Sequence, residues 1–534
     1  MGRLRVQVAS FTLAVACGVL TLYGQSGDRH VIIENLGLPA IDQGLLVHNL
    51  THAPGTAETL HRANIREALR EDGGKSGARY AAGRLIVKFR ESASPEQRQS
   101  ALRAITSSAS IDPQPSYADF DMVRMDPAVD AEAAADALAQ HAAVEYAQPA
   151  YRVRAMAVPN DPLYATRQWN LPLINLERAW DLQPQNAPQI IVAVLDTGIA
   201  YMNATLVETI PAWRDEFGRL YPALGRVTIP YNGATQLMAP GRFVAPHDFI
   251  WDNDLPLDFE GHGTHVAGTI GQLTNDATGP AGVAEGRAAA GQFRVKLMPV
   301  KVIDTVWDEL FGAPNTATDA TVARGIRYAA DNGAKVINMS IGRTGPPDRA
   351  PAIEDAINYA VGRGVFIAIA AGNDFEDGNP LEVIAEIASR VEGAVSVAAV
   401  DRAKARAFYS NTGSWVELAA PGGSNRGFSG PDGFIFQQTF DFDFVETYDL
   451  SPAQYRAPRF DVLANIGYIG TSMATPHVSG LAAMMMQQGI TDPKAVEAAL
   501  ERFAIDLGTP GRDNSFGYGL VDARASLRGL GLAK

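Results

Sequence analysis

Residues 470–480 read Gly-Thr-Ser-Met-Ala-Thr-Pro-His-Val-Ser-Gly and place a serine, Ser472, where a helix is about to begin. Gly470 permits close backbone approach, and Pro476 has no N–H, so we expect this proline in the first helical turn. Unpaired N–H groups and the positive end of the dipole at a helix N-terminus stabilise a developing oxyanion. The segment therefore predicts a nucleophilic serine, although a Ser/Thr cap before a core helix fits the same residues.

An acid and a base precede this serine in the chain. Residues 191–195 form an uninterrupted apolar run that is typical of a buried parallel strand, and Asp196 follows at its carboxyl end. Catalytic groups of open α/β sheets collect at that end. His262 lies in a glycine-flanked turn before a helix of small residues. A nucleophilic serine needs such a base, and the base needs a carboxylate, but singly Asp196 also fits a strand-end cap and His262 a core histidine.

Three motifs in the order Asp, His, Ser resemble those of the subtilisin-like serine peptidases, the subtilases, from about residue 160 to about residue 523. The resemblance implies that Ser472 is the nucleophile, His262 the general acid/base and Asp196 the orienting carboxylate. It also implies a three-layer α/β fold with a parallel sheet between helices. The expected activity is that of a serine endopeptidase acting on proteins or peptides.

The resemblance extends to the groups that hold the substrate. Asn373 follows the apolar run 365–370, and by resemblance its side-chain amide binds the oxyanion beside the Ser472 N–H; a turn-forming Asn is the alternative. Segment 336–342 resembles the strand that pairs with the substrate backbone. Small residues there leave room for a large apolar substrate side chain, and these segments contain no acidic cluster, although a charge could arrive from elsewhere. The residues predicted to bind substrate are Ser340, Ile341, Gly342, Ala370, Ala371 and Gly372.

Other chemistries fit the motifs less well. His262 and His265 are three residues apart, as in some metal pairs, but the Glu of a His-Glu-x-x-His zinc motif is missing. Ala474 stands where the nucleophile elbow of esterases has glycine. A catalytically inactive, peptide-binding subtilase would be expected to lack one of the four catalytic groups. A transpeptidase or macrocyclase using the same acyl-enzyme stays open.

Composition fits a precursor of several parts. The 534 residues, 46% of them hydrophobic, suffice for a large core and an accessory domain. The net charge of −14 argues against nucleic acid or an anionic membrane as the main partner. One cysteine excludes an intramolecular disulfide.

The N-terminus has the pattern of an export signal, predicted over residues 1–24. Arg3 and Arg5 precede an apolar segment over residues 6–23, so we expect a secreted or cell-envelope protein, periplasmic or extracellular. A transmembrane anchor is the alternative, but the segment is near the lower length limit, and we expect no transmembrane domain in the mature enzyme. Cys17 follows Ala-Val-Ala and resembles a lipoprotein attachment box, which leaves a lipid anchor open.

Two further regions precede the peptidase domain predicted over residues 158–534. Residues 25–82 fit a leader or linker. Residues 83–157 predict a small α+β module with strands at 85–89, 120–125 and 144–146 and helices from a capping box at Ser94 to 105 and over 130–141. Residues 144–149 resemble the end of a subtilase propeptide, which implies a ferredoxin-like prodomain that inhibits the enzyme and assists its folding. An unrelated α+β domain is the alternative.

The resemblance also implies a structural calcium ion, while catalysis itself needs no cofactor. Residues 160–164 resemble the start of a mature subtilase, in which Asp161 ligates calcium, and the loop 274–280 resembles its partner. The family's further acid is missing from residues 201–205, so an Asn-Asp turn is the alternative. The implied ligands are Asp161, Asp276 and the backbone carbonyls of Thr274, Thr278 and Pro280.

Two insertions distinguish this chain from small subtilases. One lies at residues 213–248, between Asp196 and His262. The second, at 423–468, contains alternating aromatic residues that predict an edge hairpin. The alternative is a loop whose aromatic side chains contact the substrate, but packing of these side chains within the protein is the favoured interpretation.

Overall fold

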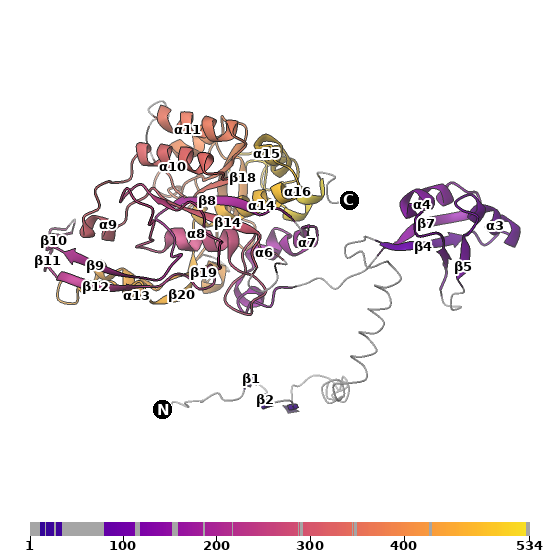
Figure 1. The fold of residues 1–534 in the computed structure, drawn as a ribbon, viewed down its shortest axis with the longest axis horizontal. Coiled ribbons are helices and arrows are strands. Elements are labelled where there is room, and N and C mark those ends of the chain that lie inside the picture. The colour runs from indigo at the N-terminus through magenta and orange to yellow at the C-terminus, as the bar shows by residue number, and fades with distance from the viewer. Residues whose placement is uncertain are drawn as a thin grey trace. The chain divides into compact units, whose positions relative to one another are not determined.

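A computed structural model describes residues 11–15, 18–25, 28–34, 80–112, 118–151, 158–184, 187–215, 217–286, 288, 292–343, 345, 350–426 and 430–529. It divides into two compact units, residues 1–155 and 156–534, each with its own internal contacts (Figure 1). The lipoprotein box at Cys17 and residues 35–79 of the predicted leader lie outside the described residues.

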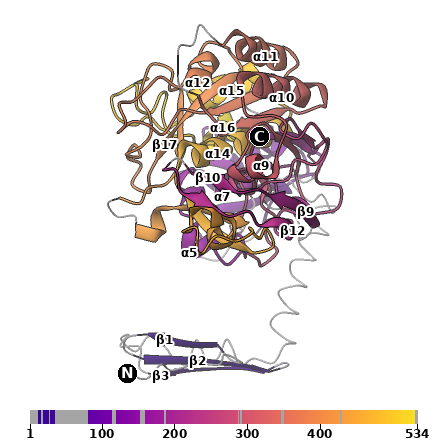
Figure 2. The same cartoon turned by 90° about the vertical axis from the view of Figure 1, so that its left-hand side faces the viewer.

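The first strands of the chain form a three-stranded antiparallel sheet with β2 in the middle (Figure 2). The strands are β1 (Phe11–Val15), β2 (Gly18–Gln25) and β3 (Asp28–Glu34). Within the described part of the chain, no helix combines the length and the apolar character that crossing a bilayer requires.

The rest of the first unit is an α+β module whose antiparallel sheet has the order β5-β6-β4-β7. Ser94 begins α3 with the predicted capping box: its hydroxyl accepts from Gln97 N at 3.3 Å, and Gln97 Oε1 accepts from Ser94 N at 2.8 Å. Alternate residues of β4 bury Leu85 and Val87 against the helices. The elements are β4 (Tyr80–Phe89), α3 (Pro95–Arg103), β5 (Ser110–Asp112), β6 (Asp121–Arg124), α4 (Ala131–Ala139) and β7 (Val144–Tyr151).

This strand order, with a helix after β4 and another after β6, is the predicted ferredoxin-like arrangement. The short strand β5 was not predicted, and the predicted last strand is five residues too short, because β7 continues to Tyr151.

The second unit is built around a seven-stranded sheet in which every pairing is parallel. Its strands, in spatial order, are β13 (His247–Asp248), β14 (Val295–Lys301), β8 (Ile190–Asp196), β15 (Val336–Met339), β16 (Phe366–Ala370), β17 (Ala394–Val400) and β18 (Leu418–Pro421). Successive residues of β8 enter opposite cores, Val194 on one face and Leu195 on the other. This explains why the predicted strand is apolar throughout.

Helices cover both faces of this sheet. One core contains residues of α8 (His262–Gly271) and α14 (Thr471–Gln487), and the other contains residues of α10 (Asp319–Asp331) and α11 (Pro351–Gly362), which lie side by side in both views (Figures 1 and 2). The predicted three-layer α/β fold is therefore confirmed. The other helices are α5 (Tyr164–Arg167), α6 (Asn170–Leu173), α7 (Leu176–Trp180), α9 (Val306–Phe311), α12 (Val383–Ala388), α13 (Phe442–Val445), α15 (Pro493–Arg502) and α16 (Ala523–Gly529).

Both insertions contain antiparallel ribbons outside the main sheet, although the first ends in β13, the edge strand of that sheet. The first contributes β10 (Trp213–Arg214), β11 (Leu220–Tyr221) and β12 (Gly225–Tyr231), which pairs with β9 (Ala204–Ile210). In the second, β19 (Ile435–Phe440) pairs with β20 (Leu463–Tyr468), and this ribbon contains Phe436 and Phe440. The later aromatics Phe442 and Phe444 belong to α13 instead, so the predicted hairpin is confirmed only for part of the alternating set.

Candidate active site

Asp196 and His262 meet where β8 ends and α8 begins. His262 Nδ1 lies 2.7 Å from Asp196 Oδ1, which also accepts a hydrogen bond of 2.8 Å from Thr197 N. The Asp196 side chain is 1% exposed and the His262 side chain 24% exposed. Burial alone lowers the pKa of His262, but the charge and hydrogen bond of Asp196 outweigh it and raise that pKa to about 9. The pair is therefore arranged to stabilise an imidazolium.

Ser472 is the second residue of α14, as the sequence predicts for a serine at a helix start. Its hydroxyl donates to the backbone carbonyl of Ser340 at 3.2 Å. Between these two described side chains, Ser472 and His262, no hydrogen bond is present. A rotation of the Ser472 side chain must bring its Oγ to His262, a rearrangement that is common when an unliganded site receives its substrate.

The side-chain oxygen of Asn373 is fixed by hydrogen bonds, which leaves its amide nitrogen available as a donor. Its Oδ1 accepts from Thr471 N at 2.8 Å and from Thr471 Oγ1 at 2.9 Å. A Cβ atom built on Gly470 would lie 3.6 Å from Ser472 N and 3.7 Å from Asn373 Nδ2. Two N–H donors thus flank one small space beside the serine, an arrangement that can bind an oxyanion.

The predicted position of Pro476 is wrong. Helix α14 begins at Thr471, so Pro476 lies inside the helix, in its second turn, rather than in the first. A proline there leaves the carbonyl four residues earlier, that of Ser472, without its helical N–H partner. The Ser340 hydroxyl donates to this carbonyl at 2.8 Å instead. A bond from outside the helix therefore replaces the missing one and ties Ser472 to the segment predicted to bind substrate.

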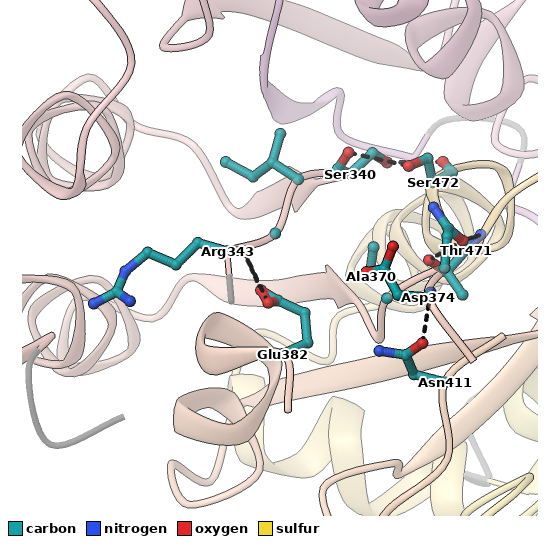
Figure 3. Close-up of a pocket in the computed structure, with 12 residues that line it drawn as sticks. Ser340, Arg343, Ala370, Asp374, Glu382, Asn411, Thr471 and Ser472 are labelled. Carbon is teal, nitrogen blue, oxygen red and sulfur yellow. Dashed lines mark hydrogen bonds between the residues drawn. The ribbon is translucent and has the colours of Figure 1, made fainter. Parts of the chain in front are cut away.

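A pocket of about 530 Å³ opens beside Ser472 (Figure 3). Five of the six residues predicted to bind substrate line it, and the sixth, Ala371, is buried in the core. Two acids that are not among the predicted substrate-binding residues, Asp374 and Glu382, line it as well. The full lining is Ser340, Ile341, Gly342, Arg343, Ala370, Gly372, Asn373, Asp374, Glu382, Asn411, Thr471 and Ser472.

His265, the second histidine of the metal pair considered above, forms structural contacts. Its Nε2 donates to the carbonyls of Ile435 at 3.0 Å and Ile466 at 3.2 Å, and its ring stacks on Tyr468 with 4.3 Å between centroids. Burial lowers the pKa of His265 to about 3, so the ring is neutral. His265 therefore joins α8 to the hairpin β19–β20 through its Nε2–H.

Sequence reasoning missed a second buried acid, Asp258, that fixes the loop before His262. Its carboxylate accepts from Thr197 Oγ1 at 3.1 Å and from Thr264 N and Oγ1 at 3.0 and 2.6 Å. Thr197 Oγ1 in turn accepts from Gly263 N at 3.0 Å. This network sets the loop of His262 against the end of β8. The signal available in the sequence was an Asp four residues before a Gly-flanked histidine, which favours an Asx turn.

The predicted calcium ligands lie where the first residues of the peptidase unit contact the loop 274–280. Asp161 is 3% exposed; its Oδ2 accepts from Asn275 N at 2.9 Å, and among the described residues its Oδ1 has no hydrogen-bond partner. Burial raises the pKa of Asp161 to about 6. Asp276 instead turns back within its own loop, where Oδ1 accepts from Thr278 N at 2.8 Å. An orphaned carboxylate oxygen among oxygen-rich turns fits a hard cation such as Ca²⁺.

Comparison with known proteins identifies the family of the chain. The model of the subtilase family matches residues 187–519, and that of the fervidolysin N-terminal prodomain matches residues 67–150. The chain is 30% identical to the thermophilic serine proteinase of Bacillus sp. (strain AK1), over 83% of this chain and 87% of that protein. It is 29% identical to thermitase of Thermoactinomyces vulgaris, over 65% of this chain and 91% of thermitase.

A third relative is the extracellular protease of Xanthomonas campestris pv. campestris, 31% identical over 76% of this chain and 63% of that protein. The family model covers more than half of the chain, and the match to the thermophilic proteinase spans most of both proteins. The chain therefore belongs to the subtilase family of serine proteases and carries an N-terminal prodomain of the fervidolysin type.

Proposed function

We propose that this protein is a secreted serine endopeptidase that hydrolyses peptide bonds through Asp196, His262 and Ser472 and is made as a self-processing precursor. The observation that carries the proposal is the placement of two N–H donors, Ser472 N and Asn373 Nδ2, around one space next to Gly470. The Asp196–His262 pair at 2.7 Å supplies the base.

In this mechanism the substrate backbone lies along residues 340–342 and its side chain enters the pocket. Ser472 Oγ attacks the scissile carbonyl carbon while His262 Nε2 takes the hydroxyl proton and Asp196 holds Nδ1–H. The carbonyl oxygen becomes an oxyanion between Ser472 N and Asn373 Nδ2. The C–N bond then breaks as His262 gives its proton to the leaving amine, and water repeats the sequence to release the acyl group from Ser472.

Maturation follows from the same chemistry. The prodomain ends after β7, and the peptidase unit is described from residue 158, so the cleavage site is proposed between residues 151 and 160. A junction that is covalently joined to the enzyme is presented at high effective concentration, so even a poor cleavage sequence is cut. The prodomain, proposed over residues 83–157, then acts as an intramolecular inhibitor and folding aid.

Export is supported by the basic and apolar N-terminal pattern of residues 1–24 and by the printed name of the Xanthomonas relative, an extracellular protease. The same pattern leaves attachment through Cys17 as an open variant of the proposal. Calcium would be held by Asp161, together with oxygens of the loop 274–280, and would supply stability by neutralising a buried carboxylate.

The proposal is tested by labelling the mature enzyme with a fluorophosphonate and identifying the modified residue by mass spectrometry. Labelling of Ser472, and pairs of peptide products whose summed masses exceed that of the substrate by one water, are the expected results. Label on another residue would reject the nucleophile. Products joined to an amine or to their own N-terminus, without added water, would make the enzyme a transpeptidase or macrocyclase.

A further inference from the structure

The substrate pocket contains a carboxyl group that does not come from either of the segments predicted to form it. Glu382 precedes α12, and it lines the same cavity as Ser472 and Gly342 (Figure 3). A second carboxyl, that of the exposed Asp374, lines the cavity next to Asn373.

Glu382 is fixed rigidly against the substrate-binding segment. Its Oε1 accepts from Arg343 N at 2.7 Å and from Ile384 N at 3.3 Å, and its Oε2 accepts from Arg343 N at 2.8 Å. A Cβ on Gly342 would lie 2.8 Å from Glu382 Cδ, so a larger residue there would displace the carboxyl from its present position. A carboxylate has about four lone-pair directions, so Oε2 keeps one for a donor inside the pocket.

The cation among the described residues that line the pocket, Arg343, is engaged by another acid. The Arg343 side chain extends away from Glu382 (Figure 3), and its guanidinium binds Asp319 through Nε at 2.7 Å and Nη2 at 3.0 Å. Among the described residues, neither Glu382 nor Asp374 forms an ion pair with a lysine or arginine, which leaves two acids facing the cavity. Burial raises the pKa of Glu382 to about 8, because the loss of water outweighs the backbone hydrogen bonds and the charge of Arg343, which lower that pKa.

We propose that Glu382 makes the pocket select substrates with a lysine or arginine immediately before the scissile bond. The small residues Gly342, Ala370 and Gly372 leave a channel for the aliphatic stem, and the cationic end donates to Glu382 Oε2. The inference rests on the proposed peptidase function. The sequence predicts a large apolar substrate side chain in this pocket, whereas the proposal is that the pocket binds the side chain of a substrate lysine or arginine.

The test compares kcat/KM for peptides that differ only in having Lys or Met, of similar length, before the cleaved bond. The variant is Glu382→Gln, which keeps shape and acceptor oxygen but removes the charge. The control is Asp377→Asn, which removes an equal charge from an exposed position outside the pocket. We expect kcat/KM to be about tenfold or more higher for the Lys peptide than for the Met peptide in wild type and in the control. In Glu382→Gln this Lys/Met ratio should fall by about tenfold or more. A ratio near one in wild type, or an unchanged ratio in Glu382→Gln, would overturn the proposal.

A second measurement uses only the wild-type enzyme, so the proposal can be tested even if Glu382→Gln does not fold. Benzamidine, a planar cation, should inhibit at least tenfold more strongly than neutral benzamide, and equal inhibition would count against Glu382. Fluorophosphonate labelling distinguishes a failure of the proposed peptidase function from a failure of the proposed role of Glu382. Failure to label and to cleave any peptide rejects the proposed function, whereas labelling with cleavage after apolar residues rejects the role of Glu382 alone.

Discussion

The Ser340 hydroxyl donates to the Ser472 backbone carbonyl at 2.8 Å and takes the place of the helical N–H that Pro476 lacks. We expect Ser340→Ala to lower the free energy of unfolding by about 1–3 kcal/mol, because the carbonyl loses its partner, and to lower kcat/KM with it. Adding Pro476→Ala restores an N–H to Ser472 O, so the double variant should recover stability.

Thermal unfolding of the single and double variants measures this coupling. Ser389→Ala is the control, since it removes a comparable bond of 2.8 Å to the Glu386 carbonyl at the end of α12. Pro476→Ala should not rescue that control. Strict additivity of Ser340→Ala and Pro476→Ala would show that the two residues do not share the Ser472 carbonyl.

Removal of the nucleophile should abolish activity without unfolding the protein. Ser472→Ala is expected to reduce kcat by about 10⁶, the loss found when subtilisin loses its serine. Asn373→Ala should cost less, about 10²–10³, because Ser472 N still binds the oxyanion. Steady-state kinetics with a chromogenic peptide, alongside circular dichroism, is the measurement. Unchanged kcat in Asn373→Ala would mean that another donor fills the site.

The pH dependence of activity should follow His262, which must be neutral to act as a base. With its pKa near 9, kcat/KM rises with pH and levels off above that value. Asp196→Asn removes the main charge that raises the pKa, so the limb should move to lower pH while activity falls by about 10⁴.

The same pKa makes a prediction for stability. Because the folded pKa lies above the unfolded value, protonated His262 stabilises the native state fully below about pH 6.5, and this contribution is lost as pH rises through 9. NMR titration of the His262 ring provides a direct check. If the rise of kcat/KM with pH occurs at the same pH in Asp196→Asn as in wild type, the assignment of Asp196 would be contradicted.

Calcium should stabilise the mature enzyme through Asp161. The folded pKa of this buried carboxyl is near 6, above its unfolded value, so ionising it costs stability as pH rises from 4 to 6 unless a cation is bound. Added Ca²⁺ should therefore raise Tm at pH 8 with concentration, and much less at pH 5. Asp161→Asn should remove most of the response, whereas Asp374→Asn should retain it. Identical Tm values with calcium and chelator at pH 8 would eliminate the site.

Maturation should require the enzyme's own serine. The Ser472→Ala precursor is expected to accumulate uncut in a protease-deficient host, while wild type is cut between residues 151 and 160. N-terminal sequencing locates the cut, and added prodomain covering residues 83–154 should inhibit the mature enzyme. A fully active wild-type chain that starts before residue 83 would make the module a permanent domain.

Local patterns predicted the fold and most of the candidate site because the decisive residues sit beside long apolar runs. Asp196 ends a strand buried on both faces, and Asn373 follows another, so strand and site come from the same local pattern. The parallel sheet then brings such strand ends together, as its general topology requires.

The errors and omissions arise where distant segments meet. The predicted position of Pro476 was wrong because a helix interior tolerates proline only when another group replaces its hydrogen bond. Here that group is the hydroxyl of Ser340, which lies 132 residues before Ser472 in the chain. Glu382 was not assigned to the pocket because nothing near it in sequence marks it as facing Gly342. Its position depends on how α12 packs after Asn373, which is a property of tertiary structure.

The hairpin β19–β20 matters for anyone who edits this enzyme. Thr439 Oγ1 donates to the Gly261 carbonyl at 2.6 Å, His265 is held by both strands, and β20 ends two residues before Gly470. Exchanging the strands for a relative's shorter loop would thus change the supports of both the base and the nucleophile. Loop grafting should be confined to the tip, since the strands behave as part of the catalytic frame.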